Sequence, residues 1–376
     1  MSLKLLLIAA VAAAAADDAS PNSSASEAAP AETSPPAEPS TPPTSRTPTP
    51  TKPAQKLPFK LALRAARPWS FGATVAPVLY GTALAYAAED AFSAPLLVLT
   101  LVTTLGVHAA GNLINTLYDF ERGFDSAGSS DTTLVSGQLK PGQVAALARR
   151  AYAVAAAAAA PLLAAAVGLP VATRGVFALA SRAPLGHLLG ALGLGGLSAF
   201  VYTGGPGLKY RALGDVLISL TFGPLLVGFA YLVQAGVAPG AAPLVASLAL
   251  AAPIEAILHA NNARDVDEDR ANGVKTLAGM LGPARSKVLY RGLMAAPFAL
   301  AAHAAWANGA FAALPLLAAP AALKLVGEFD AGDLRALPKR TAKYTMRLGL
   351  LLVAGALLPA PPLKELVVAA VSALRG

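Results

Sequence analysis

The sequence predicts an all-α protein, a polytopic membrane helix bundle with about nine transmembrane helices. Of its 376 residues, 55% are hydrophobic and 13% are charged, and the mean hydropathy is +0.56. A soluble protein normally carries about a quarter charged residues, so this composition indicates a membrane protein. Apolar stretches that are long enough to cross a bilayer as helices recur along the chain.

Composition divides the chain into three parts. Residues 1–56 begin with a short apolar run and continue with a stretch rich in Pro, Ser, Thr and Ala, which predicts a disordered or targeting extension. Residues 57–363 form the predicted membrane domain, and residues 364–376 form a C-terminal tail. The nine candidate spans fall at about residues 70–88, 94–117, 144–168, 184–203, 213–235, 239–260, 287–305, 308–326 and 343–361.

Positive charges alternate along these spans. The connections 118–143, 204–212, 261–287 and 327–343 contain Lys or Arg, whereas those near 89–93, 236–238 and 306–307 contain neither. The connection near 169–183 is a partial exception, with Arg174 and Arg182. Because basic loops mark one side of a membrane, we interpret the net charge of +8 as a topology signal and expect no nucleic-acid partner.

Two polar motifs follow long apolar runs, and both lie on the predicted basic side. Asn112, Asn115 and Asp119 are spaced i, i+3 and i+7, so one helix would place them on a single face. Asn262, Asp265 and Asp269 repeat this spacing about 150 residues later. The chain has no cysteine, and oxygen ligands suit a hard cation such as Mg²⁺, which usually completes its shell with substrate phosphate. The pair therefore predicts a clamp for Mg²⁺ and a diphosphate at a membrane surface.

Further polar residues lie close to these motifs. Gly123 ends the first helix, which places Asp125 on a loop. The polar stretch 129–141, which contains Asp131, is either a lid or floor of the site or an ordinary surface loop. The glycine-rich stretch 202–215 is expected to turn backbone N–H groups toward an anion, with Lys209 adding positive charge. His108 and His259 each precede a motif, and each is either a core residue or a proton acceptor.

These features suit the loss of diphosphate from an allylic chain. Metal ions and cationic side chains would neutralise the leaving group, and a dry bundle interior would protect the resulting carbocation. The apolar tail would run between the helices toward the lipid. An electron-rich aromatic ring near the polar mouth would then attack the cation.

The motifs GNLINTLYDFERGFD, YTGGPGLKY and HANNARDVDEDR resemble those of the UbiA superfamily of intramembrane aromatic prenyltransferases. The resemblance covers about residues 60–360 and is nearest to the animal branch that makes menaquinone-4, with bacterial 1,4-dihydroxy-2-naphthoate prenyltransferases as near relatives. It implies nine transmembrane helices, Mg²⁺ and a prenyl diphosphate donor. It also implies an integral protein of an endomembrane (endoplasmic reticulum or Golgi) or of an organellar membrane.

The resemblance assigns roles to individual residues. Asp119, Asp265 and Asp269 would be catalytic, and together with Asn115 and Asp125 they would hold the metal. The diphosphate would be bound by Asn112, Asn115, Asp125, Asp131, Lys209, Asn262 and Arg264. One departure follows the first motif, where an SDDRT pattern is expected and residues 129–133 read SSDTT, so one acid and one arginine are missing.

Several functions remain open at this point. The expected reaction transfers a prenyl group, such as that of geranylgeranyl diphosphate, to a naphthoquinol-type ring in menaquinone (vitamin K) biosynthesis. The acceptor could instead be 1,4-dihydroxy-2-naphthoate or 4-hydroxybenzoate, or the chain could be a non-catalytic prenyl-lipid sensor. An ion transporter is a further class, which the concentration of acids at one membrane face disfavours. The expected partners are the donor, an aromatic quinol and the bilayer, and the oligomeric state is open.

Overall fold

The computed structural model describes residues 59–125, 131–169, 183–358 and 360–375, and these ranges are helical apart from turns, loops and one isolated β-bridge. The predicted N-terminal extension, residues 1–56, lies outside the described residues. The helical elements are α2 (Phe59–Ala65), η2 (Pro68–Ser70), α3 (Gly72–Glu89), α4 (Ala94–Glu121), α5 (Pro141–Ala166), α7 (Leu185–Val201), η3 (Leu208–Tyr210), α8 (Gly214–Leu220), η4 (Thr221–Leu225), α9 (Leu226–Ala235), α10 (Ala241–Arg264), α11 (Val266–Ala271), α12 (Leu277–Ala307), η5 (Ala310–Ala318), α13 (Ala319–Ala331), α14 (Leu337–Leu357) and α15 (Leu363–Arg375).

The described residues contain nine long helical segments where the sequence predicts nine spans. Seven of them are long and apolar enough to cross a membrane: Pro68–Glu89, Ala94–Glu121, Pro141–Ala166, Gly214–Ala235, Ala241–Arg264, Leu277–Ala307 and Ala310–Ala331. Helix α7 is apolar but shorter, and the first half of α14 carries four basic residues. The predicted fold class is confirmed, although α12 starts ten residues and α14 six residues before the predicted spans.

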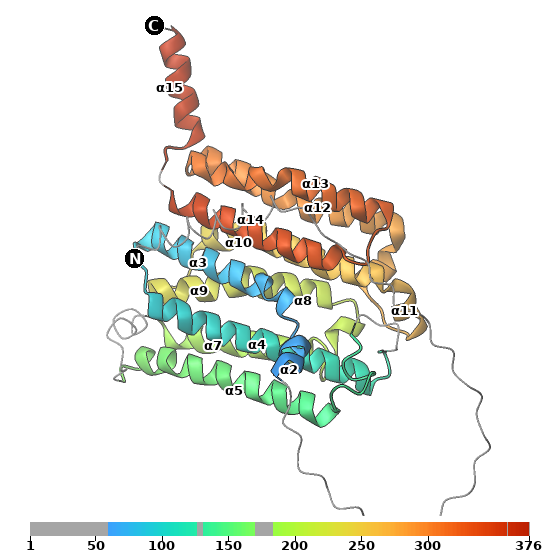
Figure 1. Ribbon diagram of the computed structural model, residues 1–376. Coiled ribbons are helices and arrows are strands. Elements are labelled where there is room, and N and C mark those ends of the chain that lie inside the picture. The colour runs from blue at the N-terminus through green and yellow to red at the C-terminus, as the bar shows by residue number, and fades with distance from the viewer. Residues whose placement is uncertain (1–58, 126–130, 170–182, 359, 376) are drawn as a thin grey trace, which may run out of the picture.

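The long helices run roughly parallel or antiparallel to one another and are stacked across the molecule (Figure 1). Helices α4, α7 and α10 end, and α3, α5, α8, α12 and α14 begin, at the same end of the bundle, on the right in Figure 1. The connections with Lys and Arg gather at this end, which we call the basic end. Both polar motifs belong to it.

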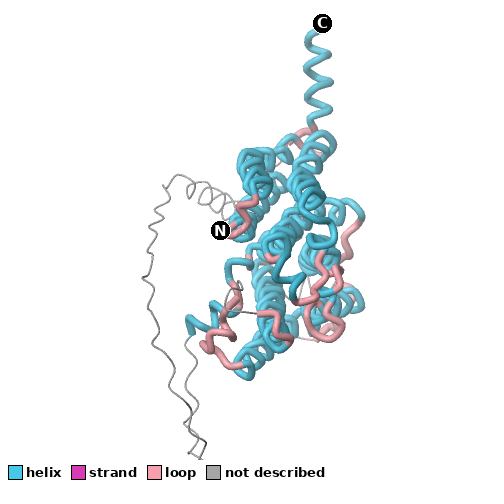
Figure 2. Tube along the Cα trace, turned by 90° about the vertical axis from the view of Figure 1, so that its right-hand side faces the viewer, coloured by secondary structure: helices cyan, strands magenta, loops and turns pink. Residues whose placement is uncertain are grey.

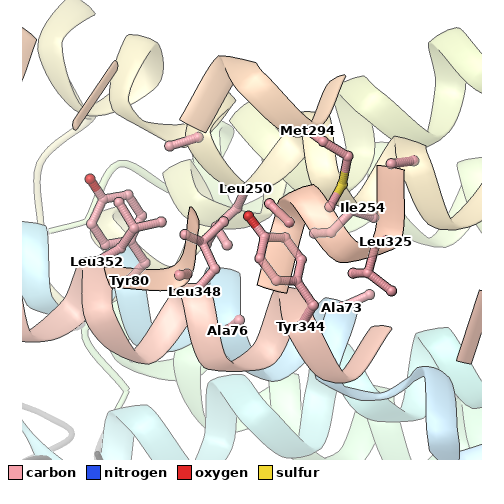
Figure 3. Packing of buried hydrophobic residues seen from close by; sticks show 14 of the residues in the cluster. Ala73, Ala76, Tyr80, Leu250, Ile254, Met294, Leu325, Tyr344, Leu348 and Leu352 are labelled. Atoms are coloured by element: carbon pink, nitrogen blue, oxygen red, sulfur yellow. The ribbon is translucent and has the colours of Figure 1, made fainter. Parts of the chain in front are cut away.

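A large buried cluster and close contacts between small residues hold the bundle together. Side chains of α3, α10, α12, α13 and α14 form the largest buried cluster, to which Tyr80, Leu250, Met294 and Leu348 all belong (Figure 3). A Cβ atom at Gly349 would lie 2.5 Å from that of Ala76, so only glycine permits this approach of α14 to α3. Small residues at such crossings replace the hydrophobic effect as the source of helix association in lipid.

Two local features depart from a bundle of regular helices. Between α8 and α9 the chain forms a π-helical turn, η4, where Pro224 lacks the N–H group that a regular helix needs. At the C-terminus, α15 stands away from the other helices in both views (Figures 1 and 2). It begins at the end of the bundle opposite to the basic end.

Candidate active site

A cavity of about 1240 Å³ opens among the helices at the basic end. Its inner wall is apolar and is formed largely by α8, η4, α9 and α10, whereas its rim carries charged side chains. All ten residues that the sequence predicts for the site line this one cavity: Asn112, Asn115, Asp119, Asp125, Asp131, Lys209, Asn262, Arg264, Asp265 and Asp269. The geometry thus brings the two motifs together, and the role of each residue remains a prediction.

The first motif lies on the last three turns of α4. Asp119 is buried, and its carboxylate accepts hydrogen bonds from the Lys209 ammonium at 2.7 Å and from the Tyr210 hydroxyl at 2.7 Å. The same Lys209 nitrogen lies 3.3 Å from Oδ1 of Asn115. Burial, and then Asp119, raise the pKa of Tyr210, which keeps this hydroxyl a donor.

The glycine-rich stretch places Lys209 but does not present the backbone N–H groups that the sequence predicts. The amide of Gly204 donates to the Phe200 carbonyl, and the amide of Gly207 donates to the Gly204 carbonyl. These donors are used inside the turn because the chain must reverse tightly there, with Gly207 at a φ of 56°. The expectation of an anion nest was therefore wrong for these two amides.

The second motif is not one continuous helix face. Helix α10 ends at Arg264, Asp265 lies between helices with φ −96° and ψ 9°, and α11 then carries Asp269. The Arg264 guanidinium donates twice to the Asp265 carboxylate, at 2.6 Å each, and this ion pair sits at the break. The helix is interrupted at Asp265, yet the amide of Asp269 still donates to the Asp265 carbonyl, and both acids line the cavity.

Hydrogen bonds to the backbone join the three polar stretches into one rim. The side-chain amide of Asn272, which follows the second motif, donates to the Phe124 carbonyl after the first motif at 3.3 Å. Ala212, within the glycine-rich stretch, donates its amide to the Lys275 carbonyl at 2.7 Å. Segments about 150 residues apart in the sequence are thereby fixed against one another.

Two carboxyl groups at the rim are partly buried, lie near other acids and have raised pKa values. Burial, with Asp119 and Asp131 nearby, raises the pKa of Asp125 to about 7. Burial also raises the pKa of Asp269 to about 6, against the opposing effect of Lys209. A bound cation would relieve this repulsion, so the site has the charge that a divalent metal requires.

The donor set also fits a hard cation. It consists of the carboxylate and amide oxygens of Asn115, Asp119, Asp125, Asp265 and Asp269. In the described part of the chain, no three carboxylates or histidines gather closely enough to enclose a metal alone. Mg²⁺ is commonly held by one or two carboxylates with phosphate and water as the other ligands, so this arrangement fits Mg²⁺ together with a diphosphate.

Arg67 is a site residue that the sequence analysis did not single out. Its guanidinium lies 2.8 Å from the Asp131 carboxylate, which also accepts a hydrogen bond from the Thr116 hydroxyl at 2.6 Å. Although burial opposes it, Arg67 holds the pKa of Asp131 below its usual range, with help from Thr116 and Thr133. An arginine thus reaches the loop that lacks its own, while Ser129 and Ser130 lie outside the described residues.

The turn that presents Arg67 is strained and held by polar contacts. Arg67 has a φ of 55°, a conformation that costs a non-glycine residue about 1–2 kcal/mol. The side-chain nitrogen (Nδ2) of Asn112 donates to the Ala66 carbonyl at 2.9 Å, and the Ser70 hydroxyl donates to the Arg67 carbonyl at 2.8 Å. The side chain of Asn112 therefore positions this turn through Nδ2, in addition to lining the cavity.

Two further acids lie behind the cavity wall and were missed. Asp215 at the start of α8 and Glu255 within α10 are each 4% exposed, and the Ser219 hydroxyl donates to the Glu255 carboxylate at 3.5 Å. Glu255 departs from the expectation that acids are confined to one face, because it lies inside a spanning helix. A single acid in an apolar run was the available signal.

The fold and the cavity define a class of protein: a membrane-embedded helix bundle whose chamber takes a molecule with a charged head and an apolar body. The UbiA prenyltransferase family matches residues 74–351. The chain belongs to the UbiA prenyltransferase family, and it is an integral membrane prenyltransferase.

Curated relatives and solved structures agree with this placement. The chain is 44% identical over 304 residues to UbiA prenyltransferase domain-containing protein 1 of Gallus gallus, which covers 80% of this chain and 86% of the relative. It is 42% identical over 295 residues to the protein of that name from Homo sapiens, covering 78% of this chain and 82% of the relative. Its fold is similar to that of a UbiA homolog from Archaeoglobus fulgidus bound to GPP and Mg²⁺, with a TM-score of 0.52, 18% identity, and coverage of 79% and 99% of the two chains.

Proposed function

We propose that this prenyltransferase uses Mg²⁺ to move a prenyl group from an allylic prenyl diphosphate to a naphthoquinol-type ring, as in menaquinone biosynthesis. The observation that carries the proposal is the single cavity that joins both acidic motifs and Lys209 to an apolar interior. The relatives at 42–44% identity and the GPP and Mg²⁺ bound to the archaeal homolog support the same class of donor.

The charged residues of the rim suit the diphosphate end of the donor. Asn115, Asp119, Asp125, Asp265 and Asp269 would hold Mg²⁺, which when bound neutralises the diphosphate as it leaves. Lys209 would then exchange part of its contact with Asp119 for a diphosphate oxygen. Arg264 and Arg67, each paired with one acid in the structure, supply further positive charge at the rim.

The apolar wall suits the tail of the donor and protects the reacting carbon. Leu217, Leu225, Phe229, Ile254 and Ile257 line the cavity away from the charged rim. A carbocation formed beside these side chains meets little water, which favours capture by an aromatic ring over hydrolysis. The geometry therefore supports transfer to an aromatic acceptor and gives no measure of the donor chain length.

The experiment that tests the proposal is an assay of the purified protein with Mg²⁺, prenyl diphosphates of several lengths, and three rings: menadiol, 1,4-dihydroxy-2-naphthoate and 4-hydroxybenzoate. Mass spectrometry of the products should show prenylation of a naphthoquinol ring. Prenylation of 4-hydroxybenzoate alone would assign the chain to another quinone pathway. Binding of the donor with no transfer to any ring would favour a prenyl-lipid sensor and contradict the proposal.

A further inference from the structure

We propose that Thr74 and His108 form the acceptor end of the cavity, where Thr74 binds a ring hydroxyl and passes its proton to His108. This inference rests on the proposed function, because it names the place and the contacts of the aromatic acceptor. Both residues line the cavity, on α3 and α4, and neither belongs to the acidic motifs. Thr74 is 1% exposed, so an acceptor would meet only its hydroxyl edge at the cavity wall.

The position of His108 matches the expected place of the reacting carbon. His108, Asn112, Asn115 and Asp119 are spaced i, i+4, i+7 and i+11, so they follow one face of α4 inward from the rim. His108 lies four residues before Asn112, which is about 6 Å deeper along the helix axis. An allylic carbon directly follows its diphosphate, so a ring at the depth of His108 adjoins that carbon.

An aromatic wall accompanies His108 at this depth. The Phe222 ring, from the π-helical turn, lies 5.1 Å from the His108 ring at 70° and also lines the cavity. Phe71 packs against His108 from another side, with ring centroids 5.4 Å apart. A flat acceptor ring would gain edge or offset contacts with Phe222, and His108 is held in place by both phenylalanines.

The hydrogen bonds around His108 assign its protons. Ser70 donates its hydroxyl hydrogen to the Arg67 carbonyl and accepts from Asn112, so its oxygen accepts from Nε2 of His108 at 3.1 Å. A neutral imidazole that carries its hydrogen on Nε2 has an unprotonated Nδ1. The Thr74 hydroxyl, 2.6 Å away, therefore donates to Nδ1, and its oxygen lone pairs remain to accept a hydrogen bond from a ring hydroxyl.

This arrangement provides a balanced proton path. The ring hydroxyl gives its proton to the Thr74 oxygen as the Thr74 proton passes to Nδ1 of His108. The ring carbon then donates an electron pair to the allylic carbon, and the bond from that carbon to the diphosphate oxygen breaks with its electrons leaving on the diphosphate. The proton on the attacked ring carbon moves to the ring oxygen as aromaticity returns. His108 thus holds the one proton that the transfer releases, and later yields it to diphosphate or water.

The second histidine beside a motif is not equivalent. His259 is fully buried, does not line the cavity and stacks on Phe329, with ring centroids 5.8 Å apart. The two interpretations that the sequence left open therefore separate. His259 is a core residue, and His108 is the candidate proton acceptor.

The test compares Thr74→Val, which removes the hydroxyl and keeps the shape, with Thr74→Ser, which keeps the hydroxyl. Thr74 contacts Nδ1 of His108, whereas Ser70 and not Thr74 bonds to Asn112, so donor binding is not expected to change. The measurements are the binding of geranylgeranyl diphosphate with Mg²⁺ and the kcat of transfer to menadiol. His108→Gln is the second variant, and His303→Gln, an exposed histidine of α12, is the control.

We expect Thr74→Val and His108→Gln to bind the donor within about threefold of wild type and to lose about a hundredfold or more in kcat, the range of general base catalysis. Thr74→Ser should recover most of the rate, and His303→Gln should match wild type. Transfer at the wild-type rate in Thr74→Val, or parallel loss of donor binding and transfer, would overturn the inference. A wild-type protein that binds the donor and prenylates no ring would instead overturn the proposed function.

Discussion

Lys209 connects the glycine-rich stretch to the first motif through its side-chain hydrogen bonds with Asp119 and Asn115. Its replacement by alanine would leave both the carboxylate and an incoming diphosphate without this cation. Losing one charged contact in a partly dry site costs about 1.5–3 kcal/mol, or roughly ten- to more than a hundredfold. We expect Lys209→Ala to weaken donor use by this factor in kcat/KM for prenyl diphosphate, with a smaller effect on the acceptor KM.

Two further variants test whether the charge of Lys209 acts at this site. Lys209→Arg should not restore full activity, because a planar guanidinium cannot replace a compact ammonium in the space among Asn115, Asp119 and Tyr210. Arg270→Ala is the control, since Arg270 is an exposed residue of the basic end that forms an ion pair with the exposed Asp267. If Lys209→Ala and Arg270→Ala have the same kinetics, Lys209 is an ordinary loop charge.

The raised pKa values of Asp125 and Asp269 predict how Mg²⁺ use depends on pH. A carboxyl group with a pKa near 6 or 7 is protonated below that pH, and a protonated carboxyl group is a poor metal ligand. Lowering the pH from 8 to 6 should therefore raise the Mg²⁺ concentration for half-maximal transfer, by up to about tenfold per pH unit for each proton displaced. Asp125→Asn should reduce this dependence, and a Mg²⁺ requirement that does not change over this range would contradict the assignment.

At the scale of elements, the close approach of α14 to α3 predicts a stability effect. A side chain larger than hydrogen at Gly349 would meet Ala76, so Gly349→Val should separate the two helices. Overpacking of this kind costs about 1–3 kcal/mol, which should lower the thermal unfolding midpoint of the protein in detergent. Gly292→Ala on α12 is the matched control, because its added Cβ would meet no atom within 4 Å. Equal midpoints for the two variants would show that the approach of α14 to α3 is not tight.

The elements also show where sequence reasoning succeeds and where it fails. Regular helix periodicity was sufficient to place Asn112, Asn115 and Asp119 on one face, and Gly123 with a φ of 73° ends that helix as expected. The break at Asp265 was not predictable from spacing, because α10 and α11 could have continued as one helix. The hydrogen bond between Arg67 and Asp131 joins residues 64 positions apart, and no local pattern encodes such a pair.

The glycines of α7 illustrate a second limit of prediction from sequence. Small residues permit close helix packing, yet a Cβ at any of four glycines of α7 would meet no atom within 4 Å: Gly190, Gly193, Gly195 and Gly196. Gly195 and Gly196 instead line the cavity and leave it wide. A glycine is compatible with a close approach, an open wall or a tight turn, and only the positions of neighbouring helices decide among them.

At the scale of the whole molecule, the gathering of the basic connections at one end predicts the topology in the membrane. Single cysteines are informative because the chain has none of its own. Glu121→Cys and Arg270→Cys, at exposed positions of the basic end, should react with an impermeant thiol reagent from the same side. Ala238→Cys, between α9 and α10, should react from the opposite side. Labelling of Glu121→Cys and Arg270→Cys from opposite sides would reject the arrangement.

The central claim is that both acidic motifs act on one Mg²⁺-bound diphosphate in one cavity, and its most direct test is transfer by purified Asp119→Asn and Asp265→Asn proteins. Both substitutions keep the side-chain shape, and each removes one negative charge from a different motif of the cavity rim. Mass spectrometry should show Mg²⁺-dependent prenylation of a naphthoquinol by wild type, abolished by chelation, and a loss of about a hundredfold or more in each folded variant. Transfer within a few-fold of wild type in either variant, or transfer that survives chelation, would contradict the claim.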